Sequence, residues 1–265
     1  GPGGAALSGP KHLTTRYVGA SEAVRAAAAA TMPDRPQHAR AIPSMVDMAA
    51  FDRSRRGRVR AAFGVAGDAP VIGWVGRPDR GTQVWDFLRA AAILRGRAPR
   101  ARFLVVGGPD AGDLHRLADD LGLAGAVIFT GARTDVPDLL AATDILVGRS
   151  QGEGLPLETA EAGAARLPVV AIAANGMGAQ IRDGVTGLVV PDGDVPAIAA
   201  AILRLAEDPA LRHRLGAALH AQGAATCATT VVVPQWTALV DEVLAERHAP
   251  PPGLFRSFVQ GGFEA

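Results

Sequence analysis

The chain has 265 residues, 48% of them hydrophobic and 20% charged, so it can bury a sizeable core as one large domain or as one domain with a fragment of a second. A net charge of +1 provides no field that would attract nucleic acid, and no apolar stretch approaches the length that spans a bilayer. The single cysteine, Cys227, has no internal disulfide partner and no metal ligands at the usual spacing, so we expect a cytoplasmic protein without a bound metal.

Residues 1–49 are predicted to form an N-terminal remnant and an interdomain linker. Apolar runs and a capping serine predict three short elements here, which are a strand over 16–19, a helix over 22–30 capped by Ser21, and a strand over 39–43. The arginine cluster that follows, over 53–60, is interpreted as a solvated helix face, with a nucleic-acid patch as the alternative.

From residue 70 onward, strand and helix patterns alternate. This alternation implies right-handed βαβ units, so we predict an α/β fold with a doubly wound, Rossmann-like parallel sheet over residues 50–233. Residues 234–265 are predicted to be a helix and a flexible tail. The predicted strands cover 71–75, 102–106, 126–129, 145–147, 168–172 and 188–190, and the predicted helices cover 84–94, 114–121, 136–142, the segment from Pro156, 197–206, 209–221 and 234–247.

The segment over residues 150–170 carries the strongest functional pattern. Pro156 suits a first helical position, so a helix is predicted to begin at about Leu155 or Pro156, with its free N–H groups directed at the carboxyl edge of the sheet. Such a helix end stabilises phosphate. The carboxylates of Glu153 and Glu161 flank it and can accept bidentate hydrogen bonds from hydroxyl groups. A diphosphate between two polyols, as in a nucleotide sugar, fits this arrangement.

The motif Ser-x-x-Glu-Gly-Leu-Pro-Leu-x3-Glu-Ala, followed by Pro-Val-Val, resembles the donor-site signature of glycosyltransferase family 4. The resemblance implies the GT-B fold and a retaining, metal-independent, hexosyltransferase-like enzyme without a cofactor. It assigns Glu153 to the transferred sugar and Glu161 to the ribose hydroxyls. The diphosphate would be met by Gly154, Leu155, Pro156 and Leu157. The alternative is that Glu153 and Glu158 only favour the helix dipole while Glu161 is solvated.

Two arginines are further candidates. The run Gly-Trp-Val-Gly-Arg over 73–77 resembles the family's Gly-Arg signature, which implies that Arg77 binds the donor diphosphate and that Arg77 and Glu153 are the residues nearest a catalytic role. A surface arginine is the alternative for Arg77. Arg133 follows a match to the family's Phe-x-Gly loop and is a candidate for contacting the base, or else a solvated residue.

The family's second phosphate cation is missing. Its Lys-Gly pair falls on Thr82-Gln83 here, so either Arg80 replaces the lysine or donor binding is weakened.

The resemblance covers residues 17–244, almost entirely the donor-binding half. Family members carry a whole domain before an interdomain passage that residues 43–47 resemble, and only about 40 residues precede it in this sequence. The implied partners are a nucleotide sugar, an unknown acceptor, and an N-terminal acceptor domain in cis or in trans, without which the chain is expected to be inactive. An exposed apolar surface near the 16–19 strand and around Trp236, Leu239 and Val240 would permit self-association.

Two other functions fit the same residues. One is a non-catalytic or degenerate nucleotide-sugar-binding module or subunit, which the missing lysine favours. The other is a nucleotide-sugar epimerase of the same fold.

Overall fold

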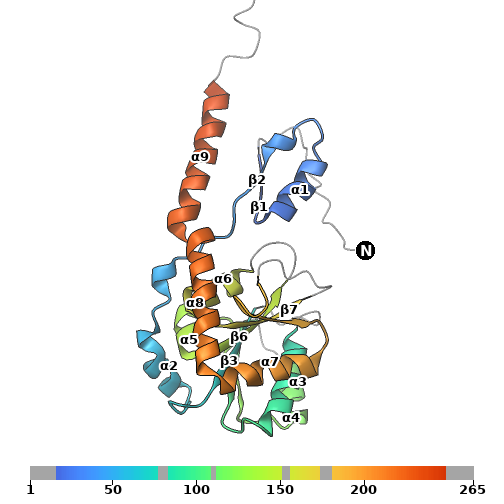
Figure 1. Cartoon of the computed structure of the whole chain (residues 1–265), viewed down its shortest axis with the longest axis vertical. Coiled ribbons are helices and arrows are strands. Elements are labelled where there is room, and N and C mark those ends of the chain that lie inside the picture. The colour runs from blue at the N-terminus through green and yellow to red at the C-terminus, as the bar shows by residue number, and fades with distance from the viewer. Residues whose placement is uncertain (1–15, 77–82, 109–111, 151–155, 174–180, 249–265) are drawn as a thin grey trace, which may run out of the picture.

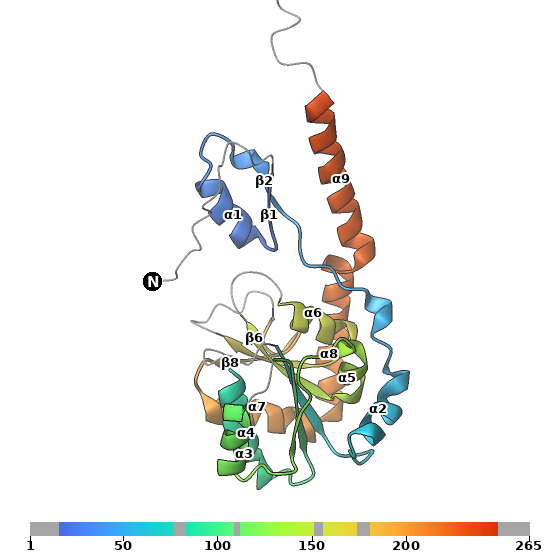
Figure 2. The same cartoon turned by 180° about the vertical axis from the view of Figure 1, so that it is seen from behind.

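The computed structural model describes residues 16–76, 83–108, 112–150, 156–173 and 181–248. In this part of the chain, a six-stranded parallel sheet with helices on both faces forms the main body, and a small two-stranded unit lies beside the long last helix (Figure 1 and Figure 2). The predicted α/β, doubly wound, Rossmann-like fold is therefore confirmed. No helix within the described ranges is long and apolar enough to cross a membrane.

The large sheet has a single reversal in its strand order. Its strands are β3 (Val71–Val75), β4 (Arg102–Val106), β5 (Val127–Phe129), β6 (Ile145–Ser150), β7 (Val169–Ala173) and β8 (Leu188–Pro191), in the spatial order β5-β4-β3-β6-β7-β8. The chain builds outward from β3 in one direction and then from β6 in the other, so β3 and β6 flank the switch point at which open α/β sheets bind ligands. The strand predictions agree within two residues except for β6, whose pairing with β7 continues to Ser150.

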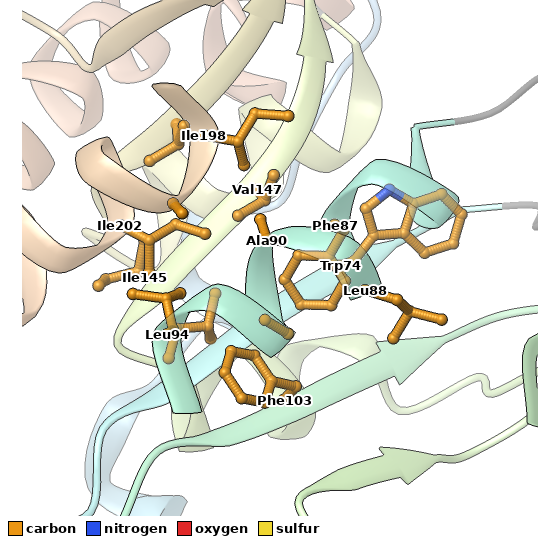
Figure 3. Packing of buried hydrophobic residues seen from close by; sticks show 14 of the residues in the cluster. Trp74, Phe87, Leu88, Ala90, Leu94, Phe103, Ile145, Val147, Ile198 and Ile202 are labelled. Atoms are coloured by element: carbon orange, nitrogen blue, oxygen red, sulfur yellow. The ribbon is translucent and has the colours of Figure 1, made fainter. Parts of the chain in front are cut away.

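Alternating side chains of the strands give the sheet two apolar faces. On one face, Ile72, Trp74 and Val147 pack against α3 (Val84–Arg95), α4 (Gly112–Asp120) and α7 (Val195–Glu207), and Figure 3 shows this core with Phe87 and Phe103 edge to face at 6.0 Å between ring centroids. On the other face, the strands pack against α2 (Arg56–Ala62), α5 (Val136–Ala142) and α6 (Leu157–Ala164). Burial on both faces explains why these strands are apolar throughout.

The last two helices are longer than predicted. Helix α8 is Pro209–Thr226 and α9 is Thr229–His248, which places Pro234 inside α9 rather than at its start. Val232, which is fully buried against Ile42 and Leu239, requires a helix that begins before the proline. Tertiary packing thus outweighs the preference of proline for the first helical turn.

The interpretation of residues 53–60 as a solvated helix face is wrong for three of the five arginines. Arg60 is only 2% exposed and donates to the carbonyl oxygens of Gly67 and Ala69. Arg56 donates to Asp144 at 2.6 Å, and Arg53 donates to the carbonyl oxygen of Thr143 at 3.1 Å. These three arginines therefore bind α2 and the turn before it to the amino edge of the sheet.

The small unit agrees with the prediction. It consists of β1 (Tyr17–Gly19), α1 (Glu22–Ala30) and β2 (Ala39–Ala41), with β1 and β2 parallel. Ser21 caps α1 and accepts a hydrogen bond from the N–H of Val24 at 3.2 Å. The segment after β2 is fixed to the junction of α8 and α9, because the N–H of Val46 donates to the carbonyl oxygen of Cys227 at 2.8 Å.

Candidate functional site

The switch point joins the two segments in which the sequence predicts ligand-binding residues. Strands β3 and β6 are neighbours, with Trp74 opposite Val147, and both end at the same edge of the sheet. The chain leaves β3 toward Arg77 and leaves β6 toward Glu153. Arg77, Glu153, Gly154 and Leu155 lie outside the described residues, as do Arg80 and Thr82, so their roles stay predictions. The topology nevertheless starts both segments from adjacent strand ends.

Glycines follow directly after β3 and β4. Gly107 has φ of +123°, and a Cβ on it would lie 1.8 Å from the carbonyl oxygen of Gly76. The N–H of Gly76 donates to the carbonyl oxygen of Val106 at 3.0 Å, and the N–H of Gly107 donates to the carbonyl oxygen of Gly131 at 2.9 Å. Only glycine permits this close approach of the two strand ends.

Helix α6 starts one or two positions later than predicted. Pro156 is the N-cap residue, with φ of −56° and an extended ψ of 143°, and Leu157 is the first helical residue. The φ of proline suits a helix and an extended segment alike, so the sequence did not distinguish the two positions. The helix still begins at the carboxyl edge, immediately after the segment that follows β6, and its first N–H groups face away from the helix body.

Small residues hold α6 close to three neighbours. Ala162 and Ala165 pack toward the sheet with Leu146. Gly163 instead faces α8, where a Cβ would lie 3.2 Å from Leu219. Ala160 and Ala164 pack against Val46 and Cys227, so only part of the small residues of α6 contact the sheet.

Glu161 is a half-buried carboxylate on this helix. Burial, together with the negative charge of Glu158 one turn earlier, raises the pKa of Glu161 to about 7. Burial also raises the pKa of Glu158. Among the described residues, neither side chain has a hydrogen-bond donor or cation from another residue. The side chain is partly buried rather than fully solvated.

Arg133 lies at the same edge but is exposed and paired. It follows β5, two strands from the switch point, and its guanidinium makes two bonds of 2.7 Å to Asp135. This ion pair raises the pKa of Arg133 further. A base-contacting role would require the pair to open or to rotate as a unit, and the assignment stays a prediction.

An open cleft of about 800 Å³ lies between the first half of α3 and the length of α4, and its lining does not include Glu158 or Glu161. Gln83, almost fully buried, donates there to Asp192 at 3.4 Å. The other lining residues are Trp85, Asp86, Arg89, Asp113, Arg116, Leu117, Asp120 and Gly193. Sequence reasoning did not identify this cleft, because its residues come from three separate segments.

Comparison with known proteins gives a match to the family described as "Glycosyl transferases group 1" over residues 69–208, just over half of the chain. The chain is 36% identical over 212 residues to a D-inositol 3-phosphate glycosyltransferase of Mycobacterium marinum, covering 76% of this chain and 42% of that protein. It is 34% identical over 165 residues to an alpha-D-kanosaminyltransferase of Streptomyces kanamyceticus, covering 61% and 42%. The chain thus spans less than half the length of these curated relatives.

Solved structures share the fold. Anabaena Alr3699/HepE, determined in complex with UDP and glucose, superposes with a TM-score of 0.75 at 23% identity, over 86% of this chain and 63% of that one. The C-terminal domain of a group 1 glycosyl transferase, LpcC from Francisella tularensis, superposes with a TM-score of 0.56 at 25% identity, over 67% and 95%.

Proposed function

Because the chain belongs to the glycosyl transferases group 1 family, we propose that it is the donor-binding half of a retaining glycosyltransferase that uses a nucleoside diphosphate sugar. Its doubly wound domain is one half of a GT-B architecture. The relatives named above are glycosyltransferases, and one neighbour in fold was solved with UDP-glucose. These likenesses support the class of reaction and leave the sugar, the base and the acceptor of this chain open.

The carboxylate of Glu161 carries the proposal. It is half-buried beside the switch point, its pKa is raised to about 7, and it has no partner from another residue within the described ranges. A carboxylate held in this way is poorly hydrated and gains by accepting hydrogen bonds from a ligand. Two adjacent ribose hydroxyls would supply both bonds, which is the role that the family resemblance implies for Glu161.

The remaining roles follow from the order of groups in a nucleotide sugar. Gly154 to Leu157 and the start of α6 would meet the diphosphate, Arg77 would stabilise the charge that develops on it as it leaves, and Glu153 would orient the transferred sugar. In a retaining reaction of this type, the acceptor attacks from the face on which the diphosphate departs. A diphosphate oxygen can then receive the acceptor's proton, so the scheme uses no metal and no cofactor.

The chain also needs a second domain to hold the acceptor. Holding an acceptor hydroxyl against the anomeric carbon lowers the barrier by up to about 7–11 kcal/mol, and a donor site cannot supply this term alone. We therefore propose that an acceptor domain acts with this chain, in cis or in trans, in the cytoplasm, and that the isolated chain transfers no sugar.

Calorimetry with UDP, GDP and ADP, each in the presence of EDTA, tests the donor site. We expect at least one of the three to bind, and excess Mg²⁺ to leave its affinity unchanged. Circular dichroism first establishes that the sample is folded. A folded chain that binds none of the three contradicts the proposal, and binding that requires Mg²⁺ contradicts its metal-independent form.

A non-catalytic binding module is the second candidate, because Thr82 stands where the family carries a phosphate-binding lysine. Nucleotide binding alone does not separate the two functions. Acceptor-dependent release of nucleoside diphosphate, measured by mass spectrometry after an acceptor domain is supplied, supports the enzyme. Tight donor binding without such release supports the module.

A further inference from the structure

Helix α8 lies beside α6 in both views of the molecule, and glycines bring the two backbones together (Figure 1 and Figure 2). A Cβ on Gly163 of α6 would lie 3.2 Å from the side chain and from the carbonyl oxygen of Leu219. A Cβ on Gly216 of α8 would lie 2.2 Å from the carbonyl oxygen of Arg166, the second residue after α6. Because no Cβ fits at that distance, α8 is in backbone contact with the carboxyl-terminal end of the helix that carries Glu161.

The turn that ends α6 has a backbone conformation that its surroundings must fix. Arg166 has φ of +56°, in the left-handed region that is unfavourable for residues other than glycine. Such a conformation persists where neighbouring groups hold it. The carbonyl oxygen of Arg166 lies against Gly216. Next to it, Arg53 donates to the carbonyl oxygen of Ala165 at 3.3 Å. Two other parts of the chain therefore hold this end of α6.

His220 adds a side-chain hydrogen bond at the same end. It lies one turn after Gly216 on α8, is half-buried, and its Nδ1 is 3.0 Å from the carbonyl oxygen of Gly163. A carbonyl oxygen can only accept, so Nδ1 carries the proton and donates. The same oxygen accepts from the N–H of Arg166 at 3.0 Å, so both of its lone pairs are used. The imidazole thus joins α8 to the last turn of α6 at a defined position.

Glu161 lies on the opposite side of α6 from this bond. Successive residues of an α-helix are turned by about 100° and rise by about 1.5 Å. Glu161, two positions before Gly163, is therefore turned by about 200° from it and lies about 3 Å away along the axis. Alanines make the contacts on the intervening faces, toward the sheet and toward Val46. A methyl group offers little surface that would resist rotation of the helix about its axis, whereas a hydrogen bond has a preferred direction.

We propose that His220 is a positioning residue of the donor site. Its Nδ1–H bond to Gly163 fixes the rotation of α6 and thereby directs the carboxylate of Glu161 toward the ribose hydroxyls of the nucleotide. His220 acts through the helix, from the side opposite the ligand. The inference rests on the proposed function, because it takes from there the role of Glu161.

Calorimetry with variants of the full chain tests this role. His220→Leu removes the donor and keeps a branched side chain, whereas His220→Asn keeps a donor close to the position of Nδ1. The ligands are whichever of UDP, GDP and ADP binds the wild type best and its 2′,3′-dideoxy form. We expect His220→Leu to bind the ribose ligand about 3–10-fold more weakly and the dideoxy ligand as the wild type does. His220→Asn should recover most of the lost affinity, and His213→Leu, at an exposed histidine of the same helix, should lose none.

The same substitution in a Glu161→Gln background separates positioning from general support of the fold. Once the carboxylate is absent, His220→Leu should cause no further loss of affinity for the ribose ligand, so the effects of the two substitutions are not additive. Nitrogen-15 NMR of the ligand-free wild type at alkaline pH, where histidine is neutral, should show the proton of His220 on Nδ1.

An equal loss of affinity for both ligands, or an undiminished loss in the Glu161→Gln background, would show that His220 only supports the fold and would overturn the proposal. A proton on Nε2 would overturn it as well. If circular dichroism shows that His220→Leu does not fold, His220→Ala replaces it under the same criteria. A wild type that binds no nucleoside diphosphate contradicts the proposed function and this role with it. A wild type and a His220→Leu variant that bind equally well contradict only the role of His220.

Discussion

The two edges of the main sheet differ in whether their carboxylates are paired. At the amino edge, Asp144, immediately before β6, binds the guanidinium groups of Arg56 and Arg60 and accepts a bond from the N–H of Val71 at 2.9 Å. At the carboxyl edge, Glu161 on the helix after the same strand has no partner from another described residue, and its pKa is raised to about 7. The first arrangement stabilises the fold. The second is expected to lower stability at neutral pH, because the carboxylate has no described partner to offset its burial.

Removing the paired carboxylate should have the largest effect. Asp144→Ala leaves Arg60, whose side chain is 3% exposed, and the half-buried Arg56 without their anion. Because breaking a buried pair leaves an uncompensated charge, we expect the free energy of unfolding to fall by about 3–5 kcal/mol, as measured by urea denaturation. Asp138→Ala is the control, since its partners Arg55 and Arg58 are exposed and its loss should cost less than about 1 kcal/mol. Equal losses would show that the amino edge is not specially stabilised.

Removing the unpaired carboxylate should instead stabilise the protein. The pKa of Glu161 rises from 4.5 to about 7 on folding, so the native state binds its proton more tightly and stability falls as the pH rises from 4.5 through 7. At about 1.4 kcal/mol per pKa unit, this shift corresponds to at most ~3.5 kcal/mol, which solvent screening reduces to about 1–2 kcal/mol. Glu161→Gln should therefore raise the free energy of unfolding by about 1–2 kcal/mol at pH 8 and leave it unchanged at pH 4. A destabilised variant at pH 8 would mean that Glu161 has a structural partner.

The smallest expected effect is a change in the pKa of Glu161 when its neighbour Glu158 is replaced. Burial is the main cause of its raised pKa and the charge of Glu158 is the second. Glu158→Gln should therefore lower the pKa of Glu161 and still leave it above its ordinary value, as followed by NMR titration of labelled glutamate side chains. Glu207→Gln, at the end of α7, is the control and should have no effect. No change in the Glu158 variant would leave burial as the only cause.

The sequence predicts most of the fold because its strands are short, apolar and separated by helices of regular period. The limits of β3, β4, α1 and α5 follow directly from those patterns. It fails where contacts between distant residues decide the outcome. The role of Arg60 depends on Asp144, 84 positions away, and the start of α9 depends on the burial of Val232 against Ile42.

For the site, sequence reasoning selects Glu161 as a candidate but does not predict its electrostatic state. The raised pKa arises from the packing of α6 and from Glu158, which the sequence presents only as a helix-favouring residue. Periodicity likewise predicts a helix near Pro156 without distinguishing a cap from a first turn. The strand order, which the sequence does not give, puts β3 beside β6, so the segments that lead to Arg77 and Glu153 start from adjacent strand ends.

The central claim is that the unpaired carboxylate of Glu161 binds the ribose hydroxyls of a nucleotide. This contact can be removed from either side, by using a ligand that lacks the hydroxyls or a variant that lacks the carboxylate. The nucleoside diphosphate that binds best and its 2′,3′-dideoxy form are titrated by calorimetry into the wild type and into Glu161→Gln. We expect the variant to bind the ribose ligand about 10–100-fold more weakly, equivalent to about 1.5–3 kcal/mol, and to bind the dideoxy ligand as the wild type does. An equal loss of affinity for both ligands, or no loss for either, would contradict the claim.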